Sequence, residues 1–156
     1  MTSDESLSLL LIEAARMLRA RNDRAFEEAG LGLTSGEART LAYASLYPGS
    51  RQNALAARMS VEPMTLVGFL DRLEGRGLIV RDTDPTDRRA KIVSIAPTAQ
   101  EAVERILTIT RLVREAALSE FAPGEVEAFH GFLRRLRDRL AVQEPSGRVA
   151  QEAVAQ

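Results

Sequence analysis

The chain has 156 residues, a formal net charge of −1 and 45% hydrophobic residues, a size that fits one domain with a substantial core, with or without a helical extension. It has no cysteine and one histidine, which excludes disulfides, thiol redox sensing and a histidine-rich metal site. No apolar run approaches the roughly 20 residues of a membrane span, and the N-terminus lacks the pattern of a secretory signal. We therefore expect a cytoplasmic protein that does not associate with membranes and has no cofactor.

Apolar residues at helical spacing predict a first helix over residues 6–28. Thr34 and Glu37 then have the spacing of a capping box, in which each side chain accepts a hydrogen bond from the other residue's backbone amide. A second helix is therefore predicted over residues 35–47.

Ser50 is a good N-cap residue and predicts a short third helix over residues 51–59. Pro63 stands where the first residue of a helix tolerates proline, so a fourth helix is predicted over residues 63–76. Gly77 follows it in the position of a C′ glycine.

Two short strands are predicted next, over residues 78–81 and 90–95. The charged turn at 84–91 joins them, and three cations gather at this tip of a β-hairpin. Although the whole chain is slightly acidic, residues 51–97 carry eight cations and six anions. The placement of charge is therefore more informative than its sum.

A second capping box, Thr98 with Glu101, predicts a long helix over residues 98–119. Pro123 begins a sixth helix over residues 123–142, and the remaining residues, 143–156, are expected to form a frayed tail. The outer helices have more apolar surface than a small hairpin module needs for its own core.

The predicted order of a short helix, a turn, a second helix and a hairpin is the geometry of a major-groove reader. The N-terminal half of that second helix offers Met64, Thr65, Val67 and Gly68. Thr65 can hydrogen-bond a phosphate or a base, or place its methyl group against a thymine methyl. Because this half has no arginine, asparagine or glutamine, we expect shape and phosphate contacts to carry much of the specificity. The alternative is that Met64 and Val67 pack in a core.

The start of the third helix brings Ser50, Arg51, Gln52 and Asn53 to a helix N-terminus, where free amides favour phosphate. We interpret these residues as a clamp on the DNA backbone. An ordinary capped surface helix is the alternative interpretation.

The hairpin tip is the sharpest signal. Asp87 can accept a hydrogen bond from Arg89 and orient its guanidinium toward a narrow minor groove, while Arg88 and Lys91 can reach phosphates. A charge cluster of this kind is often only a solvated turn, but here the preceding helix and flanking strands favour DNA binding.

The segment LDRLEGRGLIVRDTDPTDRRAKIVSIAPTAQE resembles the recognition helix, wing and following helix of the MarR/SlyA family of bacterial transcriptional regulators. Its residues 87–89 match the Asp-X-Arg wing motif of that family, and residues 73–79 match its helix-to-strand junction. The helical order matches over roughly residues 5–142. Gly68 departs from many relatives, which have a polar or arginine residue there, and the lack of cysteine removes the peroxide sensing that some relatives use.

The resemblance implies a mostly α fold with a small β-hairpin wing, a winged helix-turn-helix with N- and C-terminal dimerisation helices. The implied parts are a dimerisation helix in 1–33, the DNA-binding module in 34–97, further dimerisation helices in 98–142 and the tail. It also implies a homodimer on a pseudo-palindromic double-stranded DNA operator, often a repressor released by a small phenolic or lipophilic effector.

The candidate DNA-contacting residues are Ser50, Arg51, Gln52, Asn53, Met64, Thr65, Val67, Gly68, Arg72, Asp87, Arg88, Arg89 and Lys91. The candidate residues of an effector cleft are Met17, Arg21, Tyr43 and Tyr47, although the two tyrosines fit a core at least as well. An alternative function is a protein-interaction module that never touches DNA. A small enzyme is disfavoured because the sequence shows no nucleophile–base pair, phosphate-binding loop or metal cluster.

Overall fold

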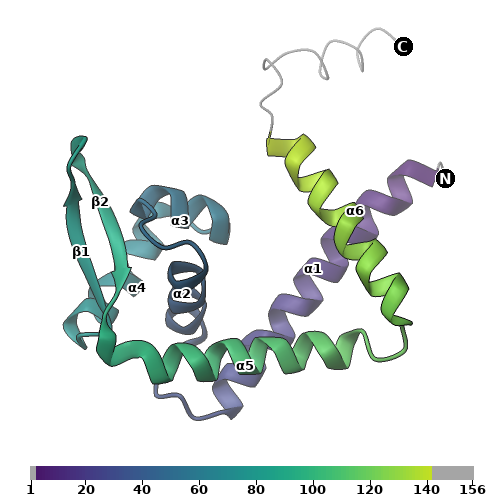
Figure 1. Cartoon of the computed structure of the whole chain (residues 1–156), viewed down its shortest axis with the longest axis horizontal. Helices are drawn as coiled ribbons and strands as arrows, with labels where there is room; N and C mark the ends of the chain where they lie inside the picture. The colour runs from purple at the N-terminus through teal and green to yellow at the C-terminus, as the bar shows by residue number, and fades with distance from the viewer. Residues whose placement is uncertain (1–2, 142–156) are drawn as a thin grey trace, which may run out of the picture. The chain divides into compact units, whose positions relative to one another are not determined.

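The computed structural model describes residues 3–141, which form six α-helices, one 3-10 turn and a two-stranded sheet (Figure 1). In chain order these elements are α1 (Ser3–Glu28), α2 (Ser35–Leu46), α3 (Gln52–Met59), α4 (Pro63–Gly75), β1 (Ile79–Asp84), β2 (Asp87–Ile95), η1 (Pro97–Ala99), α5 (Gln100–Ala117) and α6 (Pro123–Ala141). The contacts divide the chain after Ala117 into two units. Within the first unit, α1 packs on α2 and α5, and α5 also packs on α2. The division by role into residues 1–33, 34–97 and 98–142 stays a prediction.

The core of the first unit surrounds α2, which contacts α1, α3, α4, α5 and β2. Its largest fully buried apolar side chains come from six different elements: Leu41, Leu55, Met59, Leu66, Leu70, Leu73, Ile79, Val93 and Ile106. Full burial of an aliphatic side chain of this size contributes about 1.5–3 kcal/mol to folding. The helices and the hairpin are therefore joined by one continuous apolar cluster.

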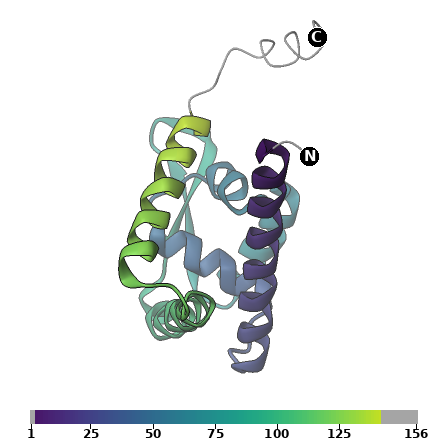
Figure 2. The ribbon, with the colours of Figure 1, turned by 90° about the vertical axis from the view of Figure 1, so that its right-hand side faces the viewer.

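Helix α1 crosses α5, as the view along α5 in Figure 2 shows. The crossing lies near the C-terminal end of α1, where Phe26 is buried and Arg105 of α5 donates a hydrogen bond to the carbonyl of Ala29 over 3.1 Å. Toward the start of α1, Leu7, Leu10 and other apolar side chains remain exposed.

The predicted capping box at the start of α2 is confirmed. The Glu37 amide donates to Thr34 Oγ1 over 3.2 Å, and the Thr34 amide donates to Glu37 Oε2 over 3.0 Å. Gly77 follows α4 with φ of +70°, the left-handed conformation expected of a glycine after a helix.

Two predicted caps are wrong. Ser50 is not the N-cap of α3, because Arg51 has that position and the Ser50 hydroxyl donates to the carbonyl of Tyr47 over 2.7 Å. Thr98 does not cap α5, because its hydroxyl donates to the carbonyl of Gly77 over 2.6 Å. The 3-10 turn η1, begun by Pro97, leads into α5 instead.

The hairpin is longer and its turn tighter than predicted. Strands β1 and β2 pair antiparallel from Ile79 opposite Ile95 to Asp84 opposite Asp87, with an irregularity beside Asp84. Only Pro85 and Thr86 form the turn, because the Asp84 carboxylate accepts a hydrogen bond from the Thr86 amide over 2.8 Å. The cations expected in a loop therefore lie on β2, next to a turn that points away from α5 (Figure 1).

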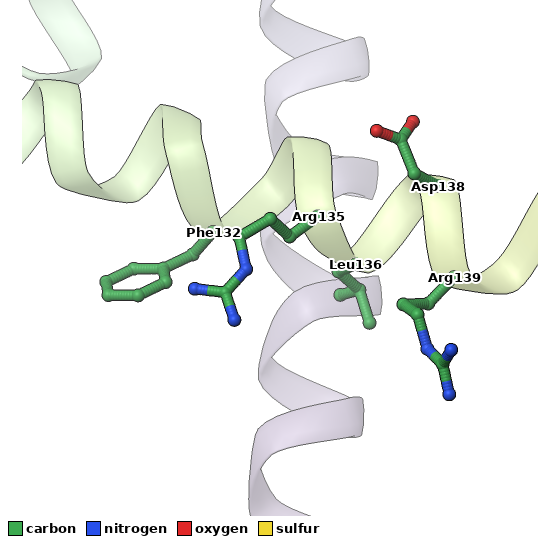
Figure 3. Close-up of a pocket in the computed structure, with 5 residues that line it drawn as sticks. All are labelled: Phe132, Arg135, Leu136, Asp138 and Arg139. Carbon is green, nitrogen blue, oxygen red and sulfur yellow. The ribbon is translucent and has the colours of Figure 1, made fainter.

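The described part of the second unit is α6 with the residues that lead into it. Its start lacks a capping side chain at Ala122, but Glu125 accepts a hydrogen bond from the Ala122 amide over 2.8 Å. No described residue of α6 is buried. Figure 3 shows Phe132 and Leu136 on the same side of the helix as Arg135 and Arg139. The predictions for Val142 and for 143–156 fall outside the described residues.

Across residues 3–141, no helix has the length and apolar character needed to cross a membrane.

Candidate nucleic-acid interface

Helix α4 buries one face and exposes the N-terminal part of the other. Leu66, Leu70 and Leu73 are fully buried at a spacing of three and four residues. Met64, in contrast, is 79% exposed, and the neighbouring Thr65 is also exposed. The predicted reading residues therefore face solvent, with Val67 and Gly68 half-buried beside them, and Met64 is not a core residue.

The exposed face of α4 is held at a fixed distance from α2 by a close contact. Gly36 of α2 lies so near Phe69 of α4 that a Cβ atom added at Gly36 would lie 2.3 Å from Phe69 Cζ. Since real side chains do not approach that closely, any larger residue at position 36 would force the Phe69 ring to move.

Arg72, a candidate DNA-contacting residue, also contacts both residues of this region, Glu37 on α2 and Phe69 on α4. Its Nε donates to Glu37 Oε1 over 2.6 Å, and its guanidinium lies over the Phe69 ring at 5.4 Å. Glu37 is buried, which by itself would raise the pKa of its carboxyl, but hydrogen bonds from the Thr34 amide and Arg72 lower that pKa overall. The Arg72 side chain is still 53% exposed, so its terminal amino groups remain accessible.

At the start of α3, the Arg51 side chain turns toward the hairpin. Its Nε donates to Asp84 Oδ2 over 2.6 Å and its Nη2 donates to Thr86 Oγ1 over 3.2 Å. Its Nη1 lies 3.9 Å from Asp87 Oδ2. The hydrogen bonds from Thr86, together with Arg51, lower the pKa of the Asp84 carboxyl. Arg51 therefore joins the helix-turn-helix to the hairpin turn.

The backbone strengthens the same junction. The carbonyl of Ser50 accepts a hydrogen bond from the Val93 amide over 3.0 Å, and Arg51 forms an isolated antiparallel bridge with Ile92. Residues 50–51 thus tie the chain before α3 to β2 by backbone contacts. Ser50, predicted as part of a phosphate clamp, uses both its hydroxyl and its carbonyl inside the protein.

Strand β2 and the start of α3 enclose a shallow groove of about 280 Å³. It is lined by Arg51, Gln52, Asn53, Ala54, Asp87, Arg89, Ala90 and Lys91. Six of the predicted DNA-contacting residues therefore come together in one groove, whereas Met64, Thr65, Val67 and Gly68 lie along α4.

Asp87 accepts the hydrogen bond that was predicted from Arg89, and the donor is the backbone amide. Its Oδ1 accepts a hydrogen bond from the backbone amide of Arg89 over 3.0 Å, so it fixes the main chain at Arg89. Arg88 and Arg89 are both exposed, and Lys91 donates to Thr83 Oγ1 over 2.9 Å.

A second ionic cluster joins the end of α4 to β1. The Arg81 side chain, 17% exposed, donates to Asp71 Oδ1 over 2.7 Å and through Nε and Nη2 to Glu74 Oε2, and the Arg81 amide donates to Glu74 Oε1 over 3.1 Å. These hydrogen bonds raise the pKa of Arg81 and lower that of Glu74. The sequence prediction missed this cluster and Asp84. The Asp-Pro dipeptide at 84–85 signals a turn, but no local pattern identifies the partners across the fold.

A separate cleft of about 400 Å³ lies between α1, α2 and α5. Its lining residues are Ala15, Leu18, Arg19, Asn22, Phe26, Arg39, Ala42, Tyr43, Leu46, Tyr47, Leu107 and Thr110. Tyr43 and Tyr47 line it as predicted and also pack against the core. Met17 and Arg21 do not line it. At 100° per residue Met17 lies on the far side of α1, whereas Arg21, three residues after the lining Leu18, lies at the edge of the lined face. The arginine that α1 contributes to the cleft is Arg19, not the predicted Arg21.

The fold and these contacts define a winged helix-turn-helix protein: α3 and α4 form the helix pair, and the hairpin is the wing. Residues 33–91 match the model of the MarR family. A protein of Thauera aromatica, named as a transcriptional regulatory protein for the hcr operon, is 34% identical over 105 residues. That alignment covers 67% of this chain and 63% of the relative, so the chain spans just under two thirds of that relative's length.

Solved structures agree with the family match. The transcriptional regulator PA3341 has a TM-score of 0.74 and 29% identity, over 88% of this chain and 99% of that one. CouR from Rhodococcus jostii RHA1, solved with bound p-coumaroyl-CoA, has a TM-score of 0.68 and 23% identity, over 87% of this chain and 94% of that one. The chain belongs to the MarR family.

Proposed function

We propose that the protein is a transcriptional regulator that binds double-stranded DNA in a sequence-specific way, with no enzymatic activity of its own. The observation that carries this proposal is the exposed face of α4 beside a cationic wing that Arg51 and Asp84 hold in place. In this proposal α4 enters a major groove, and the wing follows the adjacent minor groove with Arg89 inserted and Arg88 and Lys91 on phosphates. Such a regulator acts in the cytoplasm, where its operator is.

The groove between α3 and β2 fits the role of a phosphate site. It combines the free amides at the N-terminus of α3 with the side chains of Gln52, Asn53 and Arg89. Arg51 also lines it, but three of its nitrogens already have partners, so we assign Arg51 to positioning the wing.

The active form in this proposal is a homodimer built from α1, α5 and α6. Within each unit, large apolar side chains are left exposed: Leu7, Leu9, Leu10 and Ile12 on α1, Leu112 on α5, and Phe129, Phe132, Leu136 and Leu140 on α6. Monomeric proteins rarely expose so many apolar residues without a partner. A two-fold dimer would place two α4 helices about 34 Å apart, in successive major grooves of a pseudo-palindromic operator.

We further propose that the protein is a repressor released by an effector in the cleft between α1, α2 and α5. Two tyrosines offer aromatic faces there, and Arg19 offers a cation for an acidic group, whereas Arg39 is already paired with Asp23 over 3.2 Å. Asn22 Oδ1 is buried with no hydrogen-bond partner among the described residues, so it is free to accept a bond from a phenolic hydroxyl. CouR binds the thioester of a phenolic acid, which is consistent with a phenolic effector class.

The deciding experiment is duplex binding measured by fluorescence anisotropy over a range of salt concentrations. Phosphate contacts make the logarithm of the association constant fall linearly with the logarithm of salt concentration, with a slope near −0.9 per contact. Specific duplexes selected from a random pool should show this dependence. If no duplex is enriched or bound at low salt, the winged module serves protein interaction instead.

A further inference from the structure

The exposed N-terminal half of α4 has an unusual chemical character for a base-reading surface. Met64, Thr65, Val67 and Gly68 are its outward residues, and Thr65 alone among them has a polar side chain. Met64 projects furthest, with 79% of its surface accessible. Guanine and adenine are usually read by arginine, lysine, asparagine or glutamine, and the first two turns of α4 contain none of these.

Two of the charged groups that border this surface, Arg72 and Asp71, have partners inside the protein. Arg72 donates its Nε to the buried Glu37, which would lose a partner if Arg72 turned fully toward a base. On the next turn Asp71 accepts a hydrogen bond from Arg81 over 2.7 Å. Glu62, the N-cap residue, can only accept hydrogen bonds, so it cannot bind the acceptor atoms of guanine.

We infer that α4 selects its half-site by contact with thymine methyl groups, so that the favoured operator has thymines where Met64, Thr65 and Val67 meet the major groove. This inference rests on the proposed DNA-binding function and specifies its target. The C5 methyl of thymine is the apolar group that bases present in the major groove, and it suits thioether, isopropyl and methyl surfaces.

Gly68 lets the helix come close enough for these contacts. The nearest atom to a Cβ placed at Gly68 is Arg72 Nη1 at 3.7 Å, an ordinary contact, so no packing inside the protein requires a glycine there. Gly68 also lacks the φ that favours glycine, unlike Gly77 at +70°. The missing side chain therefore has its effect on the outer face, where backbone and bases can approach each other.

The test begins with the full chain and a random duplex pool. The enriched duplex is then made with deoxyuridine in place of thymine at single positions in the half-sites, which removes one methyl and keeps every hydrogen-bonding group. Each contacted methyl should account for about a fourfold loss of affinity, which corresponds to burying one methyl-sized group, ~0.8 kcal/mol. Deoxyuridine in the flanking sequence serves as the matched control and should leave binding unchanged.

Protein variants assign the contact. In Met64→Ala, the loss caused by deoxyuridine at the contacted position should disappear, because the methyl no longer has a partner. Thr65→Val keeps the methyl and removes the hydroxyl, and it should keep the thymine preference that Thr65→Ser loses. Since both residues are exposed, the variants should keep the wild-type circular dichroism spectrum.

The outcomes separate the two proposals. If no duplex is enriched, the DNA-binding function itself fails. If a duplex is bound but deoxyuridine has no effect, or has the same effect on the wild type and on Met64→Ala, then methyl recognition is wrong and DNA shape or Glu62 selects the site. The inference is supported if the wild type binds thymine duplexes more tightly than deoxyuridine duplexes and if substitution of Met64, Thr65 or Val67 removes this preference.

Discussion

Arg51 and Asp84 are 33 residues apart in sequence, yet the Arg51 Nε donates to Asp84 Oδ2 over 2.6 Å. This contact joins the first residue before α3 to the last residue of β1. The same carboxylate accepts hydrogen bonds from the amide and the hydroxyl of Thr86, each over 2.8 Å, and so shapes the turn of the wing. One ion pair therefore fixes both the turn and its position relative to the helix-turn-helix.

Asp84→Asn tests whether this pair positions the wing. The substitution removes a negative charge, so simple electrostatics predicts tighter DNA binding. We expect the opposite, a loss of roughly fivefold, the size typical of a partly exposed ion pair, because a loosened wing enters its groove less often. Anisotropy titrations on the selected duplex measure the affinity, and hydrogen exchange of the hairpin amides should accelerate. Tighter binding by Asp84→Asn would contradict the positioning role.

The exposed wing arginines should contribute through phosphate or minor-groove contacts. Arg88→Ala and Arg89→Ala should each reduce the slope of log affinity against log salt by about one unit. Arg114→Ala on α5 is a matched control, since it removes an exposed arginine far along the chain from the wing. Its slope should equal that of the wild type. Unchanged slopes for both wing variants would remove the wing from the interface.

Gly36→Ala should destabilise the first unit by about 1–3 kcal/mol, because the new methyl would overlap the Phe69 ring. Gly68→Ala is the matched control within a helix, and it should stabilise by about 0.8–1 kcal/mol, since alanine favours a helix over glycine and the site has room. Urea unfolding of both variants measures the difference. Adding Phe69→Leu to Gly36→Ala should recover part of the lost stability, and no recovery would argue against the clash.

The acid sensitivity of folding should depend on Glu37. Because its pKa is lowered in the folded state, the ionised carboxyl stabilises the fold above its unfolded pKa of about 4.3, and this stabilisation is lost as pH falls through the lower folded pKa. Glu37→Gln should be less stable at pH 7 by about 1 kcal/mol, the typical net value of a hydrogen bond, and the difference should shrink toward pH 3. Urea unfolding at pH 7, 5, 4 and 3 tests this, and a constant difference would contradict it.

Local sequence signals account well for the helices and poorly for the contacts between them. The capping box of Thr34 and Glu37 and the glycine after α4 are short-range patterns, and the structure confirms both. Ser50 shows the limit of such local patterns. Serine is a good capping residue, but here its hydroxyl donates to the Tyr47 carbonyl and its own carbonyl accepts from Val93 of the wing.

The same limit explains the wing. Charged residues at 87–91 predict a loop by composition, but pairing with β1 satisfies their backbone groups and extends the strand. The partners of Arg51 and Arg72 were beyond prediction, since each is at least 33 residues away and depends on how the whole unit packs. Met17 and Arg21 were placed in the cleft although helical periodicity puts Met17 on the far side of α1 and Arg21 only at the edge of the lined face.

The effector proposal can be tested by a matched pair of arginines on α1. Arg19 lines the cleft between α1, α2 and α5, whereas Arg21 does not line it and lies at the edge of the lined face. An effector that binds only the folded state stabilises it by about 2.7 kcal/mol at 100 times its dissociation constant, so p-coumarate and related phenolic acids should raise the melting temperature. Arg19→Ala should weaken that rise and Arg21→Ala should not. Effector-dependent loss of duplex binding should follow the same order. Equal behaviour of the two variants, or no shift with any phenolic acid while duplex binding stays intact, would argue against an effector in this cleft.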